Sequence, residues 1–120
     1  MIQVIFKNMK SSKVAGQMVR ERLDAIIDKF RDLRRSRIRV TLEMENSPGQ
    51  PGLDHFDVKV QVQGGRFNGL RMEKGGPQLY AVLAEVVDHL LERLNRAGDR
   101  VRVKERTIAR RFRLRALASG

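Results

Sequence analysis

Residues 56–65 read FDVKVQVQGG, and their pattern is the clearest indication of the fold in this sequence. Apolar and polar residues alternate along it: Phe56, Val58, Val60 and Val62 on one side, Asp57, Lys59, Gln61 and Gln63 on the other. Strict alternation predicts a β-strand with one buried and one wet face. The following Gly64-Gly65 favours a tight turn into a hairpin. The sequence therefore predicts a sheet with one face in water.

Three further segments complete the predicted sheet. The first strand has Ile2, Val4 and Phe6 apolar, and the second has Ile38, Val40, Leu42 and Met44 apolar between polar residues. The fourth strand, about Arg66 to Lys74, alternates less regularly. Pro and Gly are concentrated in residues 47–52, which separate the second and third strands and predict a loop.

Two segments have the 3.6-residue spacing of amphipathic helices. The first is capped by Ser11 or Ser12 and is expected to run to about Leu33. The second follows Gly75-Gly76-Pro77, which places proline at a helix start. Its apolar stripe is broad, so it is expected to be the better buried helix: Leu79, Val82, Leu83, Val86, Val87, Leu90, Leu91 and Leu94.

The order β-α-β-β-β-α predicts an α+β fold, a two-layer sandwich of a four-stranded sheet with two helices packed on one face. The first two strands are expected to be parallel and the later ones antiparallel. A chain of 120 residues suits one domain, which we place at residues 1–97, with an arginine-rich C-terminal extension at residues 98–120.

The net charge of +11 is concentrated near the C-terminus. Between Arg93 and Arg115, ten Lys or Arg residues face only two acidic residues, a net +8. Arginine forms bidentate contacts with phosphate, so nucleic acid is the expected partner. Fourteen basic residues are the candidate RNA-binding set: Lys13, Arg20, Arg22, Arg34, Arg35, Arg93, Arg96, Arg100, Arg102, Lys104, Arg106, Arg110, Arg111 and Arg113.

The chain resembles the ribosome hibernation promoting factor and ribosome-associated inhibitor family over about residues 1–97. Two motifs carry the resemblance: Val19-Arg20-Glu21-Arg22-Leu23-Asp24 followed by Phe30, and Leu79-Tyr80 followed by the aliphatic ladder to Leu94. The element order and the Gly-Gly hairpin agree with it. The arginine-rich C-terminus replaces the acidic tail or second domain of that family, which indicates a short, divergent member.

The resemblance implies a bacterial, cytoplasmic, ribosome-associated protein whose partner is the small ribosomal subunit and its rRNA. Members of that family occupy the tRNA and mRNA channel, hold rRNA backbone with basic side chains on both helices, and block translation in stationary phase. A monomer is the default expectation.

Other function classes have less support in the sequence. A general RNA-binding module not tied to hibernation remains the alternative, and a membrane-surface protein using Phe112, Leu114 and Leu117 is a weaker one. No carboxylate pair suggests acid–base catalysis, so no enzyme activity, cofactor or small-molecule substrate is expected. The two histidines, His55 and His89, lack a ligand spacing, so no metal is expected.

Overall fold

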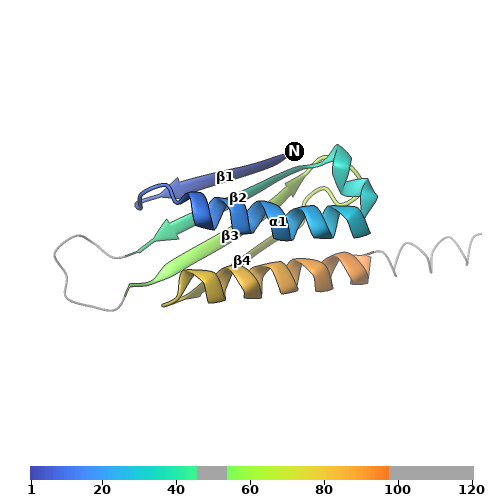
Figure 1. Ribbon diagram of the computed structural model, residues 1–120. Helices are drawn as coiled ribbons and strands as arrows, with labels where there is room; N and C mark the ends of the chain where they lie inside the picture. Colours follow the sequence, from blue (N-terminus) through green and yellow to red (C-terminus); the bar gives the residue numbers. More distant parts are fainter. Residues whose placement is uncertain (46–53, 98–120) are drawn as a thin grey trace, which may run out of the picture.

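Four strands form one open mixed sheet in the order β1-β2-β3-β4 in the computed structural model, which describes residues 1–45 and 54–97 (Figure 1). The strands are β1 (Ile2–Lys7), β2 (Arg37–Met44), β3 (Phe56–Gln63) and β4 (Arg71–Gly76). β1 is parallel to β2, and the other two pairs are antiparallel. Both relationships follow the expectation from the sequence.

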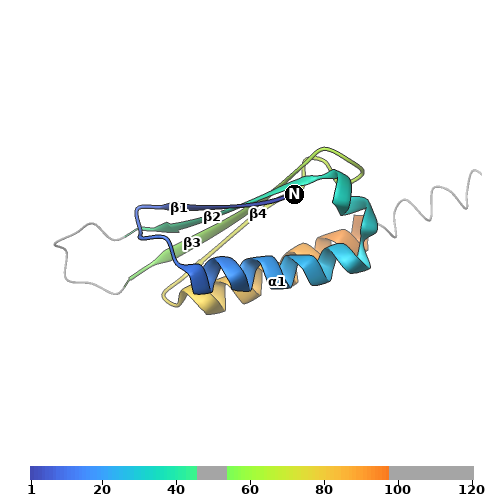
Figure 2. The ribbon, with the colours of Figure 1, turned by 45° about the horizontal axis from the view of Figure 1, so that its top comes forward.

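Two long helices lie side by side on one face of this sheet, as both views show (Figures 1 and 2). They are α1 (Lys13–Lys29) and a second helix that is helical through residues 79–97, where the description ends. The helices run in the same direction, so both begin at one end of the sheet and approach the other together. The predicted α+β architecture with the order β-α-β-β-β-α is confirmed.

The core fills the space between the sheet and the helices. Alternate residues of β2 and β3 point into it and are buried: Ile38, Val40, Leu42, Val58, Val60 and Val62. The second helix contributes Val82, Leu83, Val86, Val87, Leu90 and Leu94, six of the eight residues of its predicted apolar stripe. The other two, Leu79 and Leu91, are half-buried against the core. Phe56, expected in the core, is only half-buried because it lies at the outer end of β3 opposite Gly76.

α1 is shorter than its apolar periodicity predicts. Its start is as expected, since the Ser12 hydroxyl accepts the Ala15 N–H at 3.2 Å. Phe30 leaves helical geometry with φ −118° and ψ 80°, and its ring meets Phe67 edge-on with centroids 6.2 Å apart. A short 3₁₀ helix, η1 (Arg31–Arg35), follows. Leu33 lies in this 3₁₀ helix and is still fully buried.

The hairpin between β3 and β4 is longer than expected. Both glycines of the predicted turn have positive φ, +79° at Gly64 and +75° at Gly65. β4, however, begins at Arg71 and not at Arg66, because the chain first inserts Phe67 into the end of the core, where it is 6% exposed. The Gly69 N–H then returns to the Val62 carbonyl at 2.9 Å.

The start of the second helix also differs in detail from the expectation. β4 extends through Gly76, and the first helical residue is number 79, so Pro77 lies before the helix and not in its first turn. The Val82 N–H donates to the Gln78 carbonyl at 3.0 Å, which places Gln78 at the helix start. Within the described residues, no helix is long and apolar enough to span a bilayer.

Candidate nucleic-acid-binding surface

The positive charge is divided between the folded region and the sequence after it. Residues 1–97 contain 17 Lys or Arg and 12 Asp or Glu, a net +5. Residues 98–120 contain eight and two, the remaining +6. The predicted binding residues from Arg100 to Arg113 lie outside the described residues. A binding surface on the folded region must therefore be located from the positions of the cations in residues 1–97.

Cations gather at one end of the molecule. η1, the β3–β4 connection and the last turns of the second helix all lie at this end (Figures 1 and 2). We call it the basic end and define it by Lys29, Arg31, Arg34, Arg35, Arg37, Arg66, Arg93 and Arg96. Only Asp28, Asp32 and Glu92 accompany them along the same segments. Such an excess attracts polyanions to this end of the fold.

Packing fixes the shape of the basic end. The Ser36 hydroxyl, itself buried, donates to the Gly64 carbonyl at 2.7 Å. Arg66 forms an ion pair with Asp32 at 3.0 Å, which ties the β3–β4 connection to η1. Beneath them, Phe30 and Phe67 pack edge-on. Two segments distant in sequence, residues 30–36 and 64–67, therefore form one corner, which carries several of the arginines.

Several cations of this end are not neutralised by a neighbouring carboxylate. Arg34 pairs loosely with Asp28 at 3.8 Å, and Arg96 pairs with Glu92 one helical turn away. Within residues 1–45 and 54–97, five have no ion-pair partner: Lys29, Arg31, Arg35, Arg37 and Arg93. Exposed pairs such as Arg34 with Asp28 are weak and give way to a stronger anion.

A second group of cations lies along the edge of the sheet. Two hollows line the side of α1 that faces β1, and Arg20 borders both. Lys13 lies in one hollow beside Val4 and Phe6, and Arg34 lies in the other beside Ile2. We call these two adjoining hollows together the β1 groove; apolar residues and three cations line it, and Asp24 is the acidic residue among them.

The predicted set of basic residues is thus only partly brought together. Lys13 begins α1, whereas Arg93 and Arg96 lie in the last turns of the second helix, so the helical cations lie at opposite ends of the two parallel helices. Lys13, although it belongs to the same predicted set, is therefore not brought next to Arg93 and Arg96. Arg22 is exposed, but two residues after Arg20 it lies on another side of α1. Arg93 is half-buried and Arg35 is exposed.

The helices also expose acidic residues. Glu21, Asp24 and Asp28 interrupt the cations of α1, and Glu85, Asp88 and Glu92 follow one side of the second helix. The basic end and the β1 groove are therefore more cationic than the middle of either helix. Arg66 was missing from the predicted set, because its position beside Asp32 depends on the long β3–β4 connection.

The open face of the sheet is balanced in charge. Its central hollow is lined by Lys7, Arg39 and Lys59 on one hand and by Glu43, Asp57 and Glu73 on the other. Three cations against three anions give no net attraction for a polyanion. Arg39 lines this hollow, on the face of the sheet that is turned away from the helices. It is therefore not part of the basic end, although it is close to Arg35 in sequence.

Comparison with known proteins agrees with this architecture. The family model described as sigma 54 modulation protein / S30EA ribosomal protein matches residues 2–102. Among solved structures, the N-terminal domain of Thermus thermophilus Protein Y is similar, with a TM-score of 0.57 and 19% sequence identity. That match covers 78% of this chain and 93% of the Thermus chain. The search of curated proteins found no match. Because the family model spans most of its length, this chain belongs to the sigma 54 modulation protein / S30EA ribosomal protein family.

Proposed function

We propose that this protein is a ribosome hibernation factor that occupies the tRNA and mRNA channel of the small ribosomal subunit and thereby inhibits translation. Family membership supports ribosome binding and translation regulation. The proposal for how it binds rests on one observation: cations without an ion-pair partner among residues 1–45 and 54–97 gather at the basic end, and the sequence continues from there into residues 98–120 with a further +6.

Binding in this account is directed to the phosphate backbone of rRNA. Arg35 and its neighbours at the basic end supply fixed cations, and Lys13 and Arg20 extend them along the β1 groove. The basic residues between Arg100 and Arg113 add the rest of the charge. Phosphate contacts orient a protein on RNA but do not recognise its base sequence. In this proposal the shape of the channel therefore determines the binding position.

Inhibition requires no bond to be broken. A folded domain lodged in the channel excludes tRNA and mRNA by occupying their space, so its effect is proportional to occupancy. The protein has no enzymatic role in this account and needs no small-molecule substrate or membrane. It acts as a monomer on ribosomes in the bacterial cytoplasm, under the stress of stationary phase.

A general RNA-binding module is the alternative, and sedimentation separates the two. Purified protein is mixed with small subunits, large subunits or an equal mass of non-ribosomal double-stranded RNA, and each mixture is centrifuged through sucrose at physiological salt. We expect co-migration with the small subunit at protein concentrations at which the other two mixtures leave the protein at the top. Equal binding to all three would favour the general module and overturn the proposal.

A further inference from the structure

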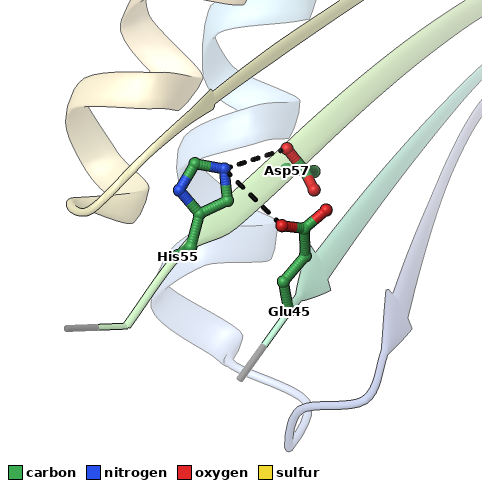
Figure 3. A group of neighbouring side chains, drawn as sticks. All are labelled: Glu45, His55 and Asp57. Carbon is green, nitrogen blue, oxygen red and sulfur yellow. Dashed lines mark ion pairs between the residues drawn. The ribbon is translucent and has the colours of Figure 1, made fainter. Parts of the chain in front are cut away.

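Three side chains converge at the opposite end of the sheet from η1, where β2 ends and β3 begins (Figure 3). Glu45 follows β2, and His55 and Asp57 lie on either side of the first residue of β3. The Glu45 N–H donates to the His55 carbonyl at 2.9 Å, so the backbone fixes the two residues opposite each other.

The side-chain atoms of these residues point toward a common centre (Figure 3). The His55 Nε2 atom is 3.4 Å from Asp57 Oδ1 and 3.8 Å from Glu45 Oε2. One ligand atom from each residue lies within 4.8 Å of the other two. Zinc bonds of about 2.0–2.2 Å in a tetrahedron hold their ligand atoms about 3.3–3.6 Å apart. The His55–Asp57 separation fits, and the exposed Glu45 side chain needs only a small rotation.

β4 leaves room for this cluster because its facing residue is glycine. Gly75 is the cross-strand partner of Asp57. A Cβ atom there would lie 2.6 Å from Asp57 Oδ1 and 2.8 Å from His55 Nε2, closer than real contacts allow. Any other residue at position 75 would displace the two best-placed ligand atoms. The glycine therefore preserves the geometry of the cluster.

The two carboxyl groups of the cluster are close enough to disturb each other. The pKa of Glu45 is raised, first by a hydrogen bond with the Asp57 carboxyl and then by desolvation and the Asp57 charge, while His55 acts in the opposite direction. Asp57 is the most sheltered of the three, with 16% of its side chain exposed.

We propose that Glu45, His55 and Asp57 bind one divalent cation of the zinc class, with water completing the coordination. An imidazole nitrogen with two carboxylates favours Zn²⁺ over Mg²⁺ or Ca²⁺, which prefer oxygen ligands alone. The ion would link the end of β2 to the start of β3, the two strands that residues 46–53 connect. This inference is independent of the proposed function, because the cluster lies at the far end of the sheet from the basic end.

Zinc binding to the full chain tests the proposal. Protein freed of metal by chelation is titrated with ZnCl₂ by calorimetry at pH 7.5, and its thermal midpoint is measured with and without the ion. We expect one saturable site and a rise of about 5 °C or more at a zinc concentration about 100 times Kd. MgCl₂ at the same concentration should give no rise.

Three variants assign the site. His55→Gln should weaken zinc binding at least tenfold, and Gly75→Ala should do so without removing any ligand. His89→Gln, at the only other histidine of the chain, is the matched control and should bind as the parent does. Each variant is melted in chelator first, so that a loss of fold is distinguished from a loss of binding. Absence of a saturable site in the parent, or equal binding by folded His55→Gln, would overturn the proposal.

Discussion

The Ser36 hydroxyl donates a 2.7 Å hydrogen bond to the carbonyl of Gly64, 28 residues further along the chain. This contact joins the corner between η1 and β2 to the connection between β3 and β4. Ser36 is the one buried polar residue of the described chain, with 3% of its surface exposed. A buried hydroxyl without a hydrogen-bond partner would destabilise the fold, so the bond to Gly64 is needed to keep Ser36 in this position. The arrangement of the basic end depends on this corner.

The corner predicts coupled effects of two substitutions. Ser36→Ala leaves the Gly64 carbonyl without its donor and should cost about 1–3 kcal/mol of unfolding free energy. Gly65→Ala should also destabilise, because φ is +75° and the new Cβ would lie 2.9 Å from Ser36 Oγ. In the double variant that oxygen is gone, so the combined loss should be smaller than the sum. Denaturant melts of all four proteins measure the coupling, and strict additivity would contradict it.

Truncation of two adjacent leucines in the second helix should lower the free energy of unfolding by different amounts. Leu90 is fully buried, so Leu90→Ala should destabilise by about 2–5 kcal/mol through the cavity it leaves. Leu91 is only half-buried, and Leu91→Ala should cost clearly less. Thermal or urea melts compare the two variants with the parent. Equal losses would mean that the helix presents a different face to the sheet.

Regular alternation made most of the fold predictable. The strands β2 and β3 and the buried stripe of the second helix follow directly from apolar spacing, because each has one face in the core. The end of α1 was not predictable from spacing, since Leu33 stays buried whether the turn is α or 3₁₀. The late start of β4 was missed for a related reason: an apolar residue such as Phe67 enters a core equally well from a loop.

The binding surface was less predictable than the fold. A count of cations identifies the charged segments but not which of them meet in space. The corner at Ser36 brings Arg66 to η1, and the parallel helices separate Lys13 from Arg93. The cluster of Glu45, His55 and Asp57 also depends on the pairing of β2 with β3. The sequence alone does not give the register that pairs Glu43 with Asp57 and so brings Glu45 close to His55.

Charge reversal at the basic end should weaken ribosome binding without unfolding the protein. Arg35 is exposed and has no ion-pair partner within the described residues, so Arg35→Glu removes a phosphate contact and adds repulsion. Lys10→Glu makes the same charge change in the connection between β1 and α1, at the other end of the sheet, and is the control. We expect at least a tenfold larger loss of small-subunit affinity for Arg35→Glu in filter binding. The account of the basic end fails if Lys10→Glu is equally harmful.

Salt should weaken binding in proportion to the number of phosphates neutralised. The logarithm of the association constant is expected to fall linearly with the logarithm of salt concentration, with a slope of about −0.7 to −0.9 per phosphate contact. Truncation after Ala97 removes eight cations and should make the slope shallower, while the melting transition of the folded region is retained. Identical slopes for the full and truncated chains would show that residues 98–120 do not touch RNA.

A protein that occupies the tRNA and mRNA channel must compete with tRNA for the small subunit. Small subunits carrying mRNA and fluorescent initiator tRNA are titrated with the full chain, and the tRNA that remains bound is measured by anisotropy. We expect tRNA to be released over the same protein concentrations that saturate the subunit, and the release to shift to higher concentration for Arg35→Glu. If the protein saturates the subunit while tRNA stays bound, the protein binds elsewhere and the channel account is wrong.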